Sequence, residues 1–268
     1  MSHHSISVAD LCYTYPDGTP ALDHVTFEIT HGESVAVVGA NGAGKSTLLL
    51  QLTGCLSPSH GSVRIGDVPI TRSTLQNIRK AVGMVFQDSD DQLFMPTVRD
   101  DVAFGPINMG LPPDDVETRV HDALTRVGAL HLQDRPPYRL SGGEKRAVAI
   151  ATVLAMSPNV LVLDEPSSNL DPHARRSLIE LLATFTHTKI IATHDLDMAL
   201  TLCERTIVMN TGGVAADGPT MDLFTNDVLL EASRLERPQI LRPCPVCGES
   251  QSQSGAPGDL GQSGILPV

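Results

Sequence analysis

GANGAGKST, residues 39–47, follows the apolar run SVAVV at 34–38 and leads into KSTLLLQL, which has the composition of a helix. The stretch fits the pattern G-x-x-x-x-G-K-[ST]. Its glycines allow backbone N–H groups to turn toward a phosphate, and the start of the helix adds the positive end of its dipole. A strand, a glycine-rich loop and a helix in this order predict a phosphate-binding loop. A plain glycine turn before a helix is the alternative interpretation.

The side chains of this loop suit a nucleoside triphosphate bound together with Mg²⁺. Lys45 supplies a positive charge for the β- and γ-phosphates, and the Ser46 hydroxyl is a ligand for Mg²⁺. The nucleotide-binding residues expected from the loop are Gly39, Asn41, Gly42, Ala43, Gly44, Lys45, Ser46 and Thr47.

Other short apolar runs predict a mostly parallel sheet that is buried on both faces. They are VGMVF (82–86), VLVL (160–163), KIIAT (189–193) and TIVMN (206–210). Helical segments between them, such as 175–185, complete an alternation of strand and helix, which is typical of an α/β fold. The first thirty residues alternate apolar and polar around the turn PDGTP, so we expect an antiparallel hairpin there and a second strand pair at 61–70. The predicted fold is an α/β phosphate-loop NTPase with an N-terminal antiparallel β subdomain and a helical subdomain at about residues 88–157.

Polar side chains follow three of the predicted strands. Asp164 and Glu165 end VLVLDE, His194 follows KIIAT, and Gln87 follows VGMVF. In open α/β sheets, ligands bind at the carboxyl ends of the strands, so we expect these side chains to meet around the phosphates. Glu165 is then placed to activate an attacking water, and His194 to bind the γ-phosphate. The expected catalytic residues are Glu165, His194, Gln87 and Lys45, and the expected Mg²⁺ ligands are Ser46, Gln87 and Asp164.

SGGEK at 141–145 has the features of a second phosphate-binding helix start. Ser141 and Glu144 form the S-x-x-E pattern of a capping box, which predicts that a helix begins here. Gly142 and Gly143 allow a close approach of the backbone to a phosphate. An ordinary capped helix is the alternative.

Taken together, these motifs resemble the nucleotide-binding subunits of ABC transporters over about residues 5 to 235. The resemblance rests on Tyr15, the loop 39–47, Gln87, LSGGE (140–144), LVLDE (161–165), SNLD (168–171) and His194, in the order of that family. It implies a RecA-like core, and it implies ATP and Mg²⁺ as cofactors. It also implies that Ser141, Gly142 and Gly143 close over ATP bound to a second subunit. Tyr15 resembles the residue that stacks on adenine, and Asp171 the residue that links the two subunits.

A narrower resemblance, to the ATPase of energy-coupling-factor importers of the cobalt/nickel type, is carried by three segments. They are YPDGTPALDHVTFEI, VFQDSDDQLFMPTVRDDVAFGPINMGL and LSGGEKRAVAIATVLAMSPNVLVLDEPSSNLDP. This resemblance implies a second ATPase subunit, most simply a copy of this chain, with a heterodimer as the alternative. It implies an integral membrane scaffold and a substrate-capture subunit as further partners. In that family the region after the glutamine contacts the scaffold, and Asp88, Asp90 and Asp91 are candidates to meet basic residues there.

Three alternatives to an energy-coupling-factor ATPase remain open. They are the ATPase of another ABC importer class, a soluble ABC-type ATPase that acts on DNA or ribosomes, and a small-molecule kinase. The net charge of −12 disfavours binding to nucleic acid, which needs a basic surface. Cobalt, nickel or a vitamin are all compatible with the sequence as the transported substrate.

Composition gives the expected location and domain limits. No apolar run approaches the roughly 20 residues that span a bilayer, and MSHHSISVAD lacks the pattern of a secretion signal. These features predict a cytoplasmic location, and the resemblance to importer ATPases implies a peripheral protein on the cytoplasmic face of the membrane. The ATPase domain is expected at 1–237 and a disordered tail at 238–268, rich in Pro, Gly, Ser and Gln. Cys244 and Cys247 in this tail form a C-x-x-C, which is half of a zinc site or, alternatively, an inert or redox-sensitive pair.

Overall fold

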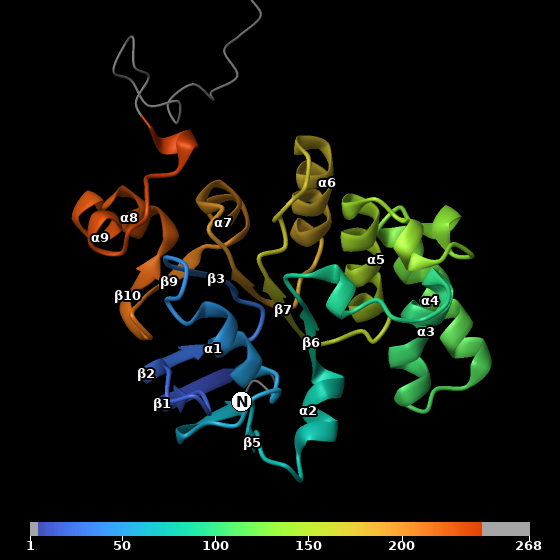
Figure 1. Cartoon of the computed structure of the whole chain (residues 1–268), viewed down its shortest axis with the longest axis horizontal. Helices are drawn as coiled ribbons and strands as arrows, with labels where there is room; N and C mark the ends of the chain where they lie inside the picture. The colour runs from blue at the N-terminus through green and yellow to red at the C-terminus, as the bar shows by residue number, and fades with distance from the viewer. Residues whose placement is uncertain (1–4, 243–268) are drawn as a thin grey trace, which may run out of the picture.

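Two sheets of different kinds organise residues 5–242, the part of the chain that this computed structural model describes (Figure 1). The larger sheet has six strands in the order β10-β9-β3-β8-β7-β6. Its members are β3 (Ser34–Val38), β6 (Val82–Val85), β7 (Val160–Asp164), β8 (Thr188–Ala192), β9 (Arg205–Asn210) and β10 (Gly213–Pro219). All neighbours pair in parallel except β10, which runs antiparallel to β9. The five apolar runs thus form the predicted parallel sheet, with β3 near its centre.

The smaller sheet is antiparallel and comes from the first seventy residues. Its order is β2-β1-β4-β5. The strands are β1 (Ile6–Thr14), β2 (Pro20–Ile29), β4 (His60–Ile65) and β5 (Val68–Pro69). Both the expected hairpin and the expected second strand pair are confirmed.

Helices cover both faces of the larger sheet. They are α1 (Lys45–Leu52), α2 (Leu75–Ala81), α3 (Val98–Asn108), α4 (Pro113–Arg126), α5 (Gly142–Leu154), α6 (Pro172–Ala183), α7 (Leu196–Leu202), α8 (Thr220–Thr225) and α9 (Asp227–Ala232). Helices α3, α4 and α5 pack on one another and form the separate lobe on the right of Figure 1. Short 3₁₀ turns lie at η1 (Ser89–Asp91), η2 (Leu130–Leu132), η3 (Pro137–Arg139) and η4 (Gln239–Leu241).

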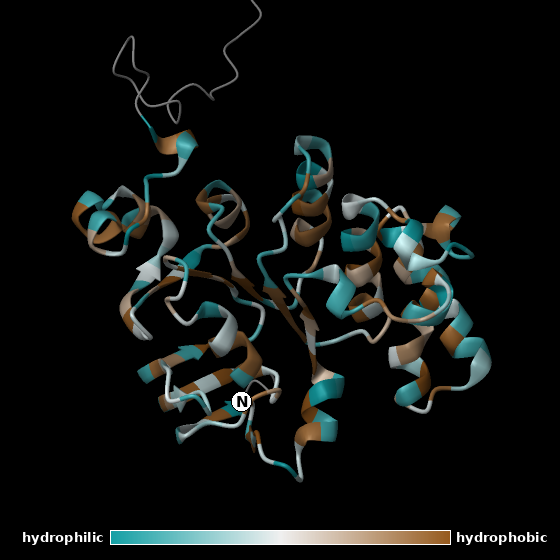
Figure 2. Ribbon diagram, in the orientation of Figure 1, coloured by the Kyte–Doolittle hydropathy of each residue, from teal (hydrophilic) through white to brown (hydrophobic). Residues whose placement is uncertain are grey.

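Helix α1 is held between the two sheets. Its buried residues Leu48, Leu49 and Leu52 belong to one apolar cluster with Ile6 of β1 and Val35 of β3. Figure 2 shows the strands of the larger sheet as a hydrophobic layer, and helix surfaces that alternate between hydrophilic and hydrophobic. Burial of this kind contributes roughly 1.5–3 kcal/mol for each large aliphatic side chain, so the start of α1 is fixed against β3. Ala43 of the glycine loop belongs to the same apolar cluster.

The described chain continues in folded form beyond residue 237. Leu241 is buried, and the backbone N–H of Ile240 donates to Asp197 Oδ1 of α7 at 3.0 Å. Composition alone placed these residues in the tail because Pro238 and Gln239 resemble the sequence that follows. The predicted boundary and the predicted helical-subdomain limits stay predictions. Of the helices within residues 5–242, none has both the length and the apolarity that a membrane span requires.

Candidate nucleotide-binding site

A cavity of about 770 Å³ lies over the start of α1. It is lined by the glycine loop together with Tyr15, Gln87, Glu165 and His194, which come from four other segments. Gln87, Glu165 and His194 come within two residues of the ends of β6, β7 and β8, at the carboxyl edge of the larger sheet. The structure therefore brings together the residues that the sequence predicted for the nucleotide phosphates.

Two glycines of the loop hold positions that no side chain can fill. A Cβ at Gly39 would lie 2.4 Å from the carbonyl oxygen of Met209, and a Cβ at Gly44 would lie 2.6 Å from that of Ala21. Gly44 also has a φ of 99°, in the left-handed region that favours glycine. The loop is thus pressed against the backbones of β2 and β9 while Asn41 remains exposed.

Lys45 is buried and bends back over the loop. Its Nζ donates to the carbonyl oxygens of Gly39 at 2.8 Å and Ala40 at 3.2 Å. The same Nζ lies 4.0 Å from Glu165 Oε1, so the cation already faces the carboxylate at the end of β7. Its charge is positioned at the mouth of the loop, where phosphates bind in proteins of this type.

Asp164 presents a buried oxygen without a partner. Its Oδ1 has no hydrogen bond among the described residues, although Asp164 is only 5% exposed. Burial raises the pKa of this carboxyl, and a hydrogen bond from the Ser46 side chain opposes that shift. An orphaned carboxylate oxygen beside a hydroxyl is a donor set that suits a hard cation such as Mg²⁺.

Glu165 and His194 form a pair inside the cavity. His194 Nδ1 lies 2.7 Å from Glu165 Oε2, and the His194 backbone N–H donates to the same oxygen at 3.2 Å. Glu165 is buried, whereas the His194 side chain is 64% exposed. Glu165 has a φ of 44°, and its N–H donates to Ala192 O of β8, so the chain turns sharply after β7. That turn sends Asp164 and Glu165 in different directions, one toward Ser46 and the other toward Lys45.

Gln87 is exposed and is positioned by a residue that sequence reasoning missed. Arg146 of α5 donates from Nη1 to Phe86 O at 2.7 Å and from Nη2 to Gln87 O at 2.5 Å. Burial lowers the pKa of this guanidinium, while Asp88 and Asp164 oppose the shift. The signal that would have found it is periodicity, because Arg146 falls on the same helical face as the buried Ala149 and Ile150.

Tyr15 lines the cavity beside Thr47 of the glycine loop. Its hydroxyl is 2.9 Å from Thr47 Oγ1, and its ring meets the ring of Tyr13 edge to face, with 5.0 Å between the centroids. Two further lining residues, Arg234 and Leu235 after α9, were not predicted. No local motif marks them, because only the folding of α8 and α9 back over the sheet brings them to the cavity.

The second glycine-containing segment begins a helix as predicted. Ser141 caps α5 in a reciprocal capping box with Glu144, whose Oε2 accepts from Ser141 N at 2.7 Å. Among these residues, Gly142 lines a neighbouring cavity of about 500 Å³ together with Ser46, Gln87 and Asp164. Ser141, Gly143 and Asp171 are absent from the lining of the 770 Å³ cavity within residues 5–242.

Asp171 has a structural role within the chain. It caps α6 by accepting hydrogen bonds from the N–H groups of His173 and Ala174, and these bonds lower the pKa of the carboxyl. Its expected contact with a second subunit stays a prediction. The predicted cysteine pair, Cys244 and Cys247, lies outside the described residues.

The acidic loop after Gln87 is partly engaged inside the chain. Asp90 Oδ1 lies 2.5 Å from Lys145 Nζ of α5, and Asp88 caps η1 by accepting from Asp90 N. Asp90 is thus already paired with a basic residue of its own chain. The proposal that all three acids reach a partner stays a prediction, and it applies best to the exposed Asp91.

Comparison with known proteins agrees with this geometry. The ABC transporter family matches residues 22–168. A putative ABC transporter ATP-binding protein of Geobacter sulfurreducens is 68% identical over 248 residues, which cover 92% of this chain and 100% of that protein. The energy-coupling factor transporter ATP-binding protein EcfA of Methanothermobacter thermautotrophicus is 46% identical over 239 residues, covering 87% of this chain and 77% of that protein.

A solved structure of an ABC transporter component has a similar fold. The structure of cbiO1 from Clostridium perfringens, described as part of the ABC transporter complex cbiONQ, superposes with a TM-score of 0.75 at 41% sequence identity. The match covers 86% of this chain and 94% of that one. The chain therefore belongs to the ABC transporter ATP-binding proteins, as an ATPase that powers transport.

Proposed function

We propose that this chain is the ATPase of an energy-coupling-factor importer, working as one of two ATPase subunits on the cytoplasmic face of a membrane scaffold. The observation that carries its ATPase chemistry is the contact of Glu165 with both His194 and Lys45 beside the phosphate loop. The relatives named EcfA and cbiO1 support the importer class.

In the proposed reaction, each residue acts on the phosphate end of ATP. Lys45 neutralises charge on the β- and γ-phosphates, and the amides of the glycine loop hold them in place. Glu165 accepts a proton from the attacking water, because its Oε2 faces the cavity beside His194. His194 orients Glu165 and hydrogen-bonds the γ-phosphate. Gln87 contacts the phosphate end of ATP and so links phosphate binding to the position of the segment that follows it.

Mg²⁺ fits the donor set of Ser46, Asp164 and Gln87. The unpartnered Oδ1 of Asp164 and the neighbouring Ser46 hydroxyl are the ligands we assign to it, directly or through water. When bound, the ion would neutralise charge that develops on the transferred phosphoryl group. In this proposal Asp164 binds the metal ion and Glu165 accepts the proton.

An exposed apolar surface after Gln87 suits the membrane scaffold. Phe94, Phe104 and Ile107 are 64%, 42% and 60% exposed, and the two phenylalanine rings meet edge to face at 5.1 Å. An apolar cavity of about 240 Å³ is lined in part by Phe94, Phe104 and Met156. Exposed aromatic clusters of this kind commonly mark protein interfaces. We assign this surface to short helices of the scaffold subunit.

The test is co-purification from membranes that carry the scaffold and capture subunits. Phe94→Ala with Phe104→Ala should reduce the scaffold recovered with the chain at least tenfold, while ATPase activity of the detergent-free chain stays within twofold. The matched control is Val228→Ala, which removes an 80% exposed aliphatic side chain from α9. Equal recovery for the double variant and the control would refute the docking assignment. Recovery of the wild-type chain with DNA or ribosomes in place of membrane proteins would favour the soluble ATPase.

The transported substrate is proposed only as a class. The sequence resemblance to importer ATPases of the cobalt/nickel type favours cobalt or nickel, and a vitamin is the other candidate. Uptake of radioactive cobalt, nickel and vitamins into cells that express the chain with its membrane subunits would decide between them. An ATPase subunit of another ABC importer class would show uptake of a different substrate through other membrane subunits.

A further inference from the structure

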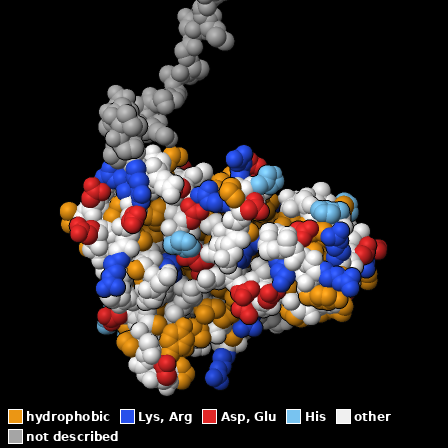
Figure 3. Space-filling model, turned by 45° about the horizontal axis from the view of Figure 1, so that its top comes forward, with side chains coloured by type: hydrophobic (Ala, Val, Ile, Leu, Met, Phe, Trp, Pro, Cys, Tyr) orange, Lys and Arg blue, Asp and Glu red, His pale blue; other side chains and the backbone are white. Residues whose placement is uncertain are grey.

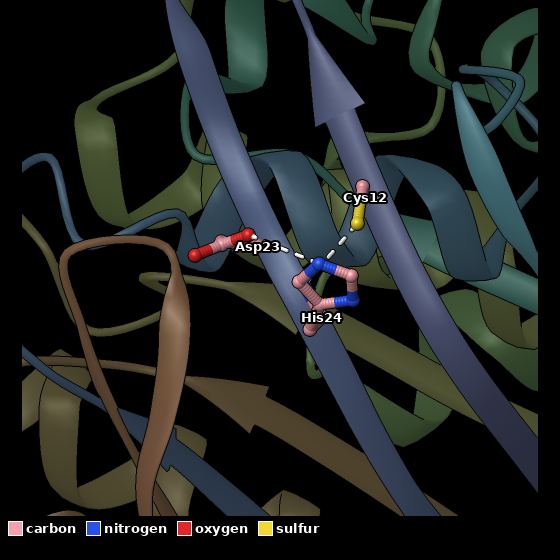
Figure 4. A group of neighbouring side chains, drawn as sticks. All are labelled: Cys12, Asp23 and His24. Atoms are coloured by element: carbon pink, nitrogen blue, oxygen red, sulfur yellow. Dashed lines mark hydrogen bonds and ion pairs between the residues drawn. The ribbon is translucent and has the colours of Figure 1, made fainter.

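Three chemically different metal-binding side chains meet on the antiparallel sheet, and none of them lines the nucleotide cavity. Cys12 of β1 lies beside Asp23 and His24 of β2 (Figure 4). One ligand atom from each residue, a sulfur, a carboxylate oxygen and an imidazole nitrogen, lies within 4.8 Å of the other two. Asp23 and His24 are exposed and the Cys12 thiol is free, so an ion from solvent can reach the group.

An irregular register brings these residues to the same side. Neighbouring residues of a regular strand point to opposite faces, so Asp23 and His24 would normally be separated by the sheet. Here His24 has a φ of 49° and Asp10 on the facing strand has a φ of 51°, and the pairing of β1 with β2 shifts between Val8 and Leu11. The His24 N–H donates to Cys12 Sγ at 3.3 Å, and His24 Nε2 lies 3.8 Å from Asp23 Oδ1.

A second layer of polar residues supports the imidazole. His24 Nδ1 lies 2.5 Å from Asp10 Oδ1, and His60 Nε2 of β4 lies 3.0 Å from Asp10 Oδ2. A carboxylate that holds one ring nitrogen of a histidine, and so fixes the tautomer and direction of the other, is the usual support of a metal-ligating histidine. His60 pairs with Cys12 across the ladder, which keeps all five residues on adjacent strands.

The donor set indicates which ions would bind. Thiolate and imidazole select Zn²⁺, Co²⁺ or Ni²⁺ over Mg²⁺ and Ca²⁺, which prefer oxygen alone. In a tetrahedral zinc site with bonds of about 2.0–2.3 Å, ligand atoms lie roughly 3.3–3.7 Å apart. The present spacing therefore needs to contract by about 1 Å, which rotation of exposed side chains can supply. We propose that Cys12, Asp23 and His24 bind one zinc-class divalent cation, with Asp10 orienting His24 and water in the fourth position.

The test measures metal binding directly, without nucleotide and with Mg²⁺ in excess. The full chain carries Cys244→Ser and Cys247→Ser in every sample, so that the tail pair contributes nothing. Co²⁺ is titrated while thiolate-to-cobalt charge-transfer absorption is recorded, and bound Zn²⁺ is counted by elemental analysis after equilibrium dialysis. We expect one equivalent per chain and a charge-transfer band. Cys12→Ser should abolish the band, and His24→Ala should weaken binding at least tenfold.

Matched variants separate this site from other cysteines and histidines. Asp10→Asn should weaken binding by about 10- to 100-fold while the band is kept at saturation, because Asp10 acts through His24. Cys55→Ser and His121→Ala change one exposed cysteine and one exposed histidine elsewhere and should leave both readouts unchanged. The proposal is overturned if the chain without Cys244 and Cys247 binds no metal. It is also overturned if Cys12→Ser and His24→Ala, with wild-type circular dichroism, keep the band and the stoichiometry.

Discussion

Replacing Glu165 with glutamine isolates proton transfer from binding. The substitution keeps the size of the side chain, and a glutamine oxygen can still accept from the His194 N–H, which now bonds Glu165 Oε2 at 3.2 Å. It also removes the negative charge 4.0 Å from Lys45 Nζ. The phosphates carry negative charge themselves, so Glu165→Gln should bind ATP at least as tightly as the wild-type chain.

The expected loss follows from the role of a general base. Such a group contributes about 10²- to 10⁴-fold to a rate, which corresponds to about 2.7–5.5 kcal/mol of activation free energy. A purely structural role would give a different pattern. Glu165 is buried and partnered, so loss of folding would reduce ATP binding together with turnover.

The assay is single-turnover phosphate release at saturating ATP and Mg²⁺, with ATP affinity measured in parallel by fluorescent-nucleotide binding. Glu180→Gln, which changes an exposed glutamate of α6, is the control and should retain the wild-type rate. A Glu165→Gln rate within threefold of wild type would show that another group takes the proton. Weaker ATP binding with a normal rate per bound nucleotide would show that Glu165 only supports the loop.

Three further changes probe the framework of the site. Arg146→Met removes the two hydrogen bonds that hold Phe86 O and Gln87 O. We expect the free energy of unfolding, measured in urea, to fall by about 2–4 kcal/mol, and the backbone of Gln87 to lose its contact with α5. Gly44→Ala places a Cβ 2.6 Å from a β2 carbonyl oxygen, and equilibrium binding should show at least a hundredfold loss of ATP affinity. The hydrogen bond from the Ser141 N–H lowers the pKa of Glu144 in the folded chain. The ionised carboxylate therefore stabilises the fold above the pKa of an unfolded glutamate, about 4.3, and this stabilisation is lost as the pH falls further. Glu144→Gln should accordingly reduce the dependence of the melting temperature on pH between about pH 5 and 3.

Much of the core was predictable because its strands are buried on both faces. A strand such as β7, whose residues Val160–Asp164 are all buried, reads as an apolar run with a polar end, and both its position and its carboxylates follow from that pattern. The start of α5 was predictable from the S-x-x-E capping box, which is a purely local signal. Local chemistry of this kind does not depend on the rest of the chain.

The remaining features depend on contacts between distant residues. Arg146 acts on backbone oxygens about sixty positions away in the sequence, and Arg234 reaches the nucleotide cavity only because α8 and α9 fold back over the sheet. The left-handed backbone at His24 follows from the register of β1 on β2, and no turn motif marks it. Strand β10 was missed because its residues alternate between intermediate and exposed positions at the sheet edge and form no apolar run.

The start of α5 gives the sharpest argument for a site shared between two chains. The capping box engages the amides of Ser141 and Glu144, so Gly142 and Gly143 remain as the first-turn donors that the cap does not use. A Cβ at Gly142 would meet no atom within 4 Å, and the residue is helical, so Gly142→Ala should fold normally and gain a few tenths to 1 kcal/mol of stability from helix propensity. Gly142 also lines the cavity that contains Ser46 and Asp164, so a loss of ATPase activity points to a second chain only when the isolated chain binds ATP and Mg²⁺ normally. We expect at least a tenfold loss at protein concentrations that support wild-type turnover, with unchanged ATP binding to the isolated chain. Full activity in Gly142→Ala, at every protein concentration, would place catalysis within a single subunit.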